Sequence, residues 1–191
     1  MNGYALKAYL KYRKQAKGRH DVHSPFVFDF VENVLRGKQK ASSNFILGIK
    51  QSNFLINRIA QYFDCRQFLW LSNNHSEELS FIGLQQMENN KASVVSKQCS
   101  WDHLKTFPTI DLVLLDINDP QEWQPTFEKL FPFISPNTIV IIPSIHQSEW
   151  HTQNWEQIAQ QPTVKLSFDL FRIGLLFFRE EFLVKQHFVL K

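Results

Sequence analysis

The sequence is poor in glycine and cysteine and contains no long hydrophobic run. Its 191 residues include 6 glycines and 2 cysteines. Nucleotide-binding loops usually need glycine, because its backbone can approach a ligand closely and adopt positive φ. The two cysteines, Cys65 and Cys99, form no Cys-x-x-Cys pair, which is typical of reduced thiols in a cytosolic protein. No stretch approaches the ~18 apolar residues of a membrane span, and the first residues lack the features of a signal peptide. We therefore expect a cytoplasmic protein with no membrane contact.

What the chain does contain is enough apolar material for a core. Hydrophobic residues make up 43% of the sequence and aromatic residues 14%, including 18 phenylalanines. This composition is typical of a globular protein, and the length suits one domain. We expect a single domain over residues 1–191, in which a helical extension (1–50) precedes an α/β core (51–191).

Charge is distributed unevenly. Residues 1–40 carry nine Lys and Arg side chains against three carboxylates, whereas the whole chain has a net charge of only +3. Two interpretations remain open: a solvated helix face, or a weak contact with phosphate or nucleic acid. Salt-dependent retention on RNA or DNA would separate them.

Hydrophobic periodicity predicts helices first and then strands alternating with helices. The expected helices cover residues 3–17, 24–36, 52–63, 76–88, 121–131 and 148–160, with a short helical turn at 101–105. Ser24 and Pro25 predict a capped start for the second helix. The expected strands cover residues 68–71, 92–95, 111–116, 138–142, 163–170 and 173–179. The first four are continuous apolar runs, which indicate a parallel sheet covered on both faces. The last two are so close in sequence that they must pair antiparallel.

Three stretches resemble a family of bacterial class I S-adenosylmethionine (SAM) methyltransferases. They are residues 9–37, which contain HSPFVFD; residues 111–120, DLVLLDINDP; and residues 139–191, which contain DLFRIGLLFFR. The resemblance implies a Rossmann-like three-layer α/β sandwich, in which a mostly parallel sheet ends in a C-terminal antiparallel hairpin. It also implies SAM as the cofactor, a substrate that the sequence does not name, and a cofactor site at the carboxyl ends of the strands.

The expected cofactor loop is degenerate. In the family, the first strand ends in an acid followed by a glycine-rich turn, whereas this chain has Trp70 in place of the acid and a turn, residues 71–76, without glycine. Asn73 can still adopt a left-handed conformation. After the next matching strand, Asp116-Ile117-Asn118 resembles the family's Asp-x-Asn. The resemblance therefore places Ser72, Asn73, Asp116 and Asn118 at the cofactor site, and we expect Trp70 to fill or narrow the cleft.

The spacing of the strands also predicts a shortened core. Only 39 residues separate Leu71 from Asp111, whereas two strand–helix units need about 60 at roughly 30 each. We expect about one strand–helix unit to be missing, and residues 92–95 could be either the second or the third strand. Neither assignment supplies a ribose-binding acid. A sheet lacking a unit could cover its exposed edge by forming a homodimer.

No metal or catalytic residue stands out. Pro143-Ser144 occupies the place of two aspartates that bind Mg²⁺ in metal-dependent relatives. His146 and His151 are five residues apart, whereas a helix presents ligand pairs at i and i+4. His23 is interpreted as part of a helix start. Two functions therefore remain: a methyltransferase with a divergent pocket, or a non-catalytic binding protein, a pseudoenzyme on a methyltransferase scaffold.

Overall fold

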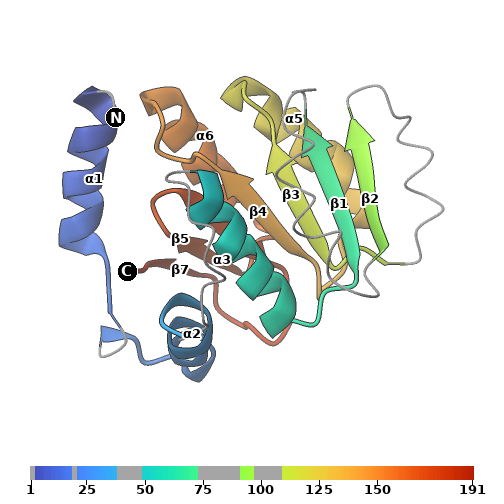
Figure 1. The fold of residues 1–191 in the computed structure, drawn as a ribbon, viewed down its shortest axis with the longest axis horizontal. Helices are drawn as coiled ribbons and strands as arrows, with labels where there is room; N and C mark the ends of the chain where they lie inside the picture. Colours follow the sequence, from blue (N-terminus) through green and yellow to red (C-terminus); the bar gives the residue numbers. More distant parts are fainter. Residues whose placement is uncertain (1–2, 19–20, 38–48, 73–90, 97–108) are drawn as a thin grey trace.

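The structure, a computed structural model, describes residues 3–18, 21–37, 49–72, 91–96 and 109–191, with the backbone alone for 49–54 and 91–96. Its centre is a seven-stranded sheet (Figure 1). The strands are β1 (Gln67–Ser72), β2 (Lys91–Ser96), β3 (Leu112–Asp116), β4 (Ile139–Pro143), β5 (Leu166–Asp169), β6 (Ile173–Phe177) and β7 (Gln186–Val189). Their order is β2-β1-β3-β4-β6-β5-β7.

All described strands except β6 run in the same direction. β1 pairs parallel with β2 and β3, β3 pairs parallel with β4, and β5 pairs parallel with β7. β6 lies antiparallel between β4 and β5. The predicted mostly parallel sheet with an antiparallel C-terminal hairpin is therefore confirmed, and its architecture is Rossmann-like. β2 pairs directly with β1, so residues 92–95 occupy the position of the second strand.

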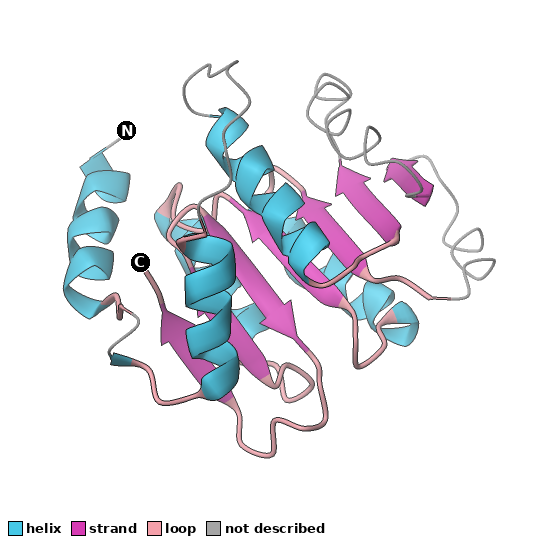
Figure 2. Cartoon of the chain, turned by 60° about the horizontal axis from the view of Figure 1, so that its bottom comes forward, coloured by secondary structure: helices cyan, strands magenta, loops and turns pink. Residues whose placement is uncertain are grey.

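Helices cover both faces of this sheet (Figure 2). They are α1 (Gly3–Gln15), α2 (Pro25–Phe30), α3 (Ile49–Tyr62), α5 (Trp123–Leu130) and α6 (Glu149–Ala159). α2 and α3 pack on one face, α5 and α6 on the other, and α1 stands beside α6 at the β7 end (Figure 1). Three layers result, as the sequence predicts. No helix in the described ranges is long and apolar enough to cross a membrane.

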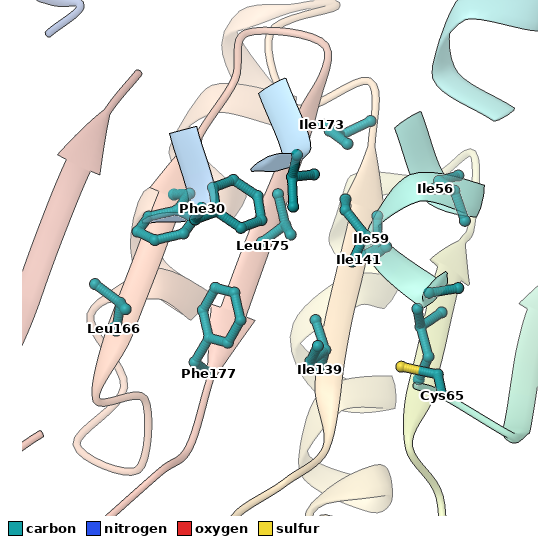
Figure 3. Packing of buried hydrophobic residues seen from close by; sticks show 14 of the residues in the cluster. Phe30, Ile56, Ile59, Cys65, Ile139, Ile141, Leu166, Ile173, Leu175 and Phe177 are labelled. Carbon is teal, nitrogen blue, oxygen red and sulfur yellow. The ribbon is translucent and has the colours of Figure 1, made fainter. Parts of the chain in front are cut away.

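The period-two alternation of the strands divides the core into two apolar clusters. On the side of α2 and α3, Phe30 and Ile59 meet Ile141, Leu175 and Phe177 (Figure 3). The residues that alternate with these along β4 and β6 point to α5 and α6. Val140 and Leu176 therefore belong to the second cluster. Both faces of the central strands are thus buried, and for this reason their sequences read as continuous apolar runs.

Several local predictions need correction. Ser24 occupies the N-cap position and Pro25 begins α2, but the Ser24 side chain makes no capping hydrogen bond. α2 continues into a π-helical turn, Val31–Leu35, rather than staying α-helical. β7 was not predicted at all. The helix and turn expected at 76–88 and 101–105 lie outside the described residues.

Candidate functional site

The predicted cofactor residues meet at the carboxyl edge of the sheet. Ser72 ends β1 and Asp116 ends β3, and the two residues are direct partners across the parallel pair. Both are half-buried, while Asn118, two residues further on, is exposed. The structure thus brings Ser72 and Asp116 together. Asn118 follows Asp116 by two residues. Asn73 lies outside the described residues, so its assignment stays a prediction.

The loop after β3 is fixed by the following helix. The indole Nε1–H of buried Trp123 donates to the carbonyl of Ile117 at 2.7 Å. Asp119 then caps the next turn by accepting from the backbone N–H of Gln121 at 2.9 Å. These two bonds hold the backbone around Asp116 and Asn118 in place.

Trp70 is a core residue. It is 3% exposed and belongs to the cluster beneath α2 and α3. Its strand partners are Val94 of β2 and Leu114 of β3. β1 therefore places an apolar ring where the family carries an acid. Whether Trp70 also narrows a cleft depends on residues 73–90, which lie outside the described part of the chain.

A second group of polar side chains lies further along the same edge. His146 follows β4, and Asp169 ends β5. The imidazole Nε2 of His146 lies 2.7 Å from Asp169 Oδ2, and both side chains are nearly buried, at 11% and 8% exposed. Asp169 Oδ1 also accepts from the backbone N–H of Phe171 at 2.8 Å, which supports the positive φ of Phe171.

The His146–Asp169 pair is extended by two hydroxyl groups. His146 Nδ1 lies 2.9 Å from Thr152 Oγ1, and the Tyr4 hydroxyl donates to Thr152 Oγ1 at 2.8 Å. The Thr152 hydroxyl can donate to His146 Nδ1 or to the carbonyl of Ser148, 3.3 Å away, so Tyr4, Thr152, His146 and Asp169 form one connected polar network. This arrangement can hold a proton or a ligand hydroxyl at a fixed place.

α1 covers this group. The Tyr9 and Tyr12 rings contact Phe171, with centroid separations of 5.0 Å and 5.3 Å. The Tyr12 hydroxyl donates to the carbonyl of Leu190, next to β7. Burial, reinforced by the negative charge of Asp169, raises the pKa of Tyr12 to about 12. α1 is thus tied to the sheet by aromatic contacts and a hydrogen bond.

A pocket of about 310 Å³ lies between α1, α6 and the ends of β5 and β7. Its α1 wall presents residues spaced three and four apart, which share one helix face. The lining residues are Tyr4, Lys7, Ala8, Lys11, Tyr12, Gln15, His146, Thr152, Trp155, Glu156, Asp169, His187 and Val189. Three aromatic residues thus share the lining with eight polar or charged ones.

His187 lies on β7 at the far side of this pocket. Its Nδ1 is 2.8 Å from the Ser167 hydroxyl, and its ring lies 6.4 Å from that of Trp155. Partial burial lowers the pKa of His187 below its usual value of about 6.5, although Asp169 and Glu156 oppose the shift. Burial therefore favours the neutral form of the His187 imidazole.

From the sequence, His146 was considered only as a possible metal-binding partner of His151. In the structure the two rings have different partners, since His151 Nδ1 lies 2.7 Å from Ser148 Oγ and its ring contacts Trp123 edge-on. Within the described residues, no group of three or more His, Cys, Asp or Glu side chains is arranged to bind a metal. The signal for the His146–Asp169 pair was that each residue ends or follows a strand of the same sheet.

No family model and no curated protein matches the sequence. Among solved structures, the chain is similar to an O-methyltransferase from Bacillus cereus in complex with SAH (12% identity, TM-score 0.46, 93% of this chain and 91% of that one). It is also similar to the O-methyltransferase TomG of Streptomyces achromogenes in complex with SAM (12%, 0.45, 94% and 91%) and to the SAH-bound methyltransferase PaMTH1 of Podospora anserina (8%, 0.46, 92% and 95%). At such identities and scores, the fold assignment rests on the sheet topology of this chain.

Proposed function

We propose that this chain is a methyltransferase-like protein whose cofactor site is degraded, and that it acts by binding rather than by methyl transfer. The observation that carries the proposal is the end of β1. Trp70 is 3% exposed in the core, where the resembled family has an acid, and the turn that follows contains no glycine. SAM is the cofactor to which such a scaffold is suited. Its ribose hydroxyls and charged groups need several polar contacts at once.

What remains of that site is Ser72 beside Asp116, with Asn118 beyond them. One carboxylate at a half-buried edge can accept one or two hydrogen bonds from a bound nucleoside. Each is worth about 0.5–3 kcal/mol, and a micromolar affinity requires about 8 kcal/mol in total. The described part of the chain therefore supplies few of the polar contacts that SAM needs.

Isothermal titration with SAM and with SAH tests this proposal. At about 100 μM protein, we expect no saturable heat with either compound. Saturable binding that Asp116→Ala removes and Glu128→Ala leaves intact would overturn it, because Glu128 lies exposed on α5, away from the carboxyl edge. Circular dichroism of both variants would establish that they fold.

A second candidate is methyl transfer by a divergent site. The observation that favours it is the nearly buried His146–Asp169 pair at the same edge of the sheet, because methylation of a hydroxyl group releases a proton that must be accepted. Transfer of labelled methyl groups from SAM to a cell fraction would support this candidate. It requires that Asp116→Ala abolish the transfer and that Glu128→Ala preserve it.

A further inference from the structure

The pocket beneath α1 is separate from the nucleoside edge, which is the carboxyl edge of the sheet at Ser72, Asp116 and Asn118. It opens at the ends of β5 and β7, and β5 is three strand positions away from β3, which carries Asp116. At about 4.8 Å per strand, the separation along the sheet is about 14 Å. A ligand in this pocket therefore has its own contacts, and its binding does not depend on SAM.

The α1 wall of the pocket carries two lysines one helical turn apart. Lys7 and Lys11 both line the pocket, and like charges at i and i+4 disfavour a helix. No ion pair joins either lysine to a carboxylate among the described residues. An anionic group between them would relieve this repulsion.

The remaining charged groups that face the pocket leave the lysine side positive. The Asp169 carboxylate already accepts from His146 and from the backbone N–H of Phe171. Glu156 lies on α6, the wall opposite α1, where its charge acts on His187. Asp169 is thus engaged within the protein and Glu156 lies on the opposite wall, so Lys7 and Lys11 form the cationic side of the pocket.

Aromatic rings form another part of the lining. Trp155 is 1% exposed and forms part of the α6 side. Tyr4 and Tyr12 contribute their rings from α1, and both hydroxyl groups are engaged, with Thr152 and with the carbonyl of Leu190. With its hydroxyl groups occupied, this side of the pocket offers ring faces more than free polar atoms.

The volume sets the size of the occupant. About 310 Å³ corresponds to roughly ten water molecules at ≈ 30 Å³ each and lies at the lower limit for ligand pockets. One substituted ring fits this space, whereas a dinucleotide or a polymer segment does not. We propose that the pocket beneath α1 binds a small aromatic carboxylate, with the ring against Tyr4 and Tyr12 and the carboxylate at Lys7 and Lys11.

The test uses three probes on the full chain without SAM: benzoate, its uncharged isostere benzamide, and acetate, which lacks the ring. We expect saturable benzoate binding by ligand-observed NMR, with benzamide and acetate each at least about tenfold weaker. Lys11→Gln should weaken benzoate binding about tenfold and leave benzamide binding unchanged. Lys7→Gln should also weaken benzoate binding. Because SAM is absent, this result is independent of whether the nucleoside edge binds SAM.

Lys14→Gln is the matched control. Lys14 lies on the last turn of the same helix and outside the pocket lining, so its loss should leave benzoate binding unchanged. Equal binding of benzoate and benzamide would overturn the role of the lysines, and equal binding of benzoate and acetate would overturn that of the rings. An equal loss in Lys14→Gln and Lys11→Gln, or no benzoate binding at about 10 mM, would overturn the site itself.

Discussion

Gly174 is the position at which one added methyl group should disturb the structure most. It lies in the middle of the sheet on β6, paired with Ile142 of β4 and Asp169 of β5. A Cβ atom at Gly174 would lie 2.5 Å from Cη2 and 2.7 Å from Cε3 of Trp155, whereas carbon atoms pack at about 3.5–4.0 Å. In Gly174→Ala the indole ring must therefore shift by about 1 Å in a site where it is 1% exposed.

Overpacking of this kind typically costs about 1–3 kcal/mol. With an m-value of about 2 kcal/mol/M in urea, a cost of 2 kcal/mol lowers the midpoint of unfolding by about 1 M. Gly3→Ala is the control, because a Cβ atom at Gly3 meets nothing within 4 Å, and its midpoint should stay within a few tenths of a molar of the wild type.

A double-mutant cycle identifies the cause. The contacted atoms belong to the distal benzo ring of the indole, and the single, smaller ring of Phe does not reach as far, so Gly174→Ala should cost less in a Trp155→Phe background. If Gly174→Ala unfolds at the wild-type urea concentration, or costs the same in both backgrounds, the close packing of Trp155 on β6 is refuted.

Three further predictions concern buried groups. Trp123→Phe removes the bond to the carbonyl of Ile117 and should cost about 1–3 kcal/mol in urea unfolding, whereas Trp150→Phe, at an exposed position, should cost little. Burial raises the pKa of the Cys65 thiol to about 12, so iodoacetamide at pH 8 should leave the Cys65 peptide unmodified in mass spectra unless urea is present; rapid native alkylation would contradict this. The folded-state pKa of His187 lies below its unfolded value of about 6.5. The unfolded chain therefore binds more protons as the pH falls below about 6.5, and the free energy of unfolding should fall between pH 7.5 and 5.5. His187→Gln should reduce that loss, and an unchanged pH dependence would show that His187 does not contribute.

The sequence predicted the parts of the fold that have strong local patterns. β3 and β4 were located to within one residue, because a strand buried on both faces must be apolar throughout. β7 was missed, since Gln186–Val189 is short and half-exposed. It forms a strand because β5 offers it an edge to pair with, and no local pattern encodes that edge.

The same distinction applies to the candidate site. The proximity of Ser72 and Asp116 follows from the rule that parallel strands end at one edge, and the structure confirms it. The His146–Asp169 pair depends on β6 lying between β4 and β5, which brings together two residues 23 positions apart. That strand order is a product of the whole sheet, so inspection of histidine spacing could not find it.

The attachment of α1 to the end of β7 has a consequence for synthesis on the ribosome. Tyr12 bonds to Leu190, 178 residues later, and the bridge between Lys17 and Leu190 spans nearly the same interval. At a translation rate of roughly 5–20 residues per second, about 10–35 s pass between the synthesis of Tyr12 and that of Leu190. During that time the face of α1 that later closes the pocket is open to solvent. The pocket is therefore completed last, when β7 has joined the sheet.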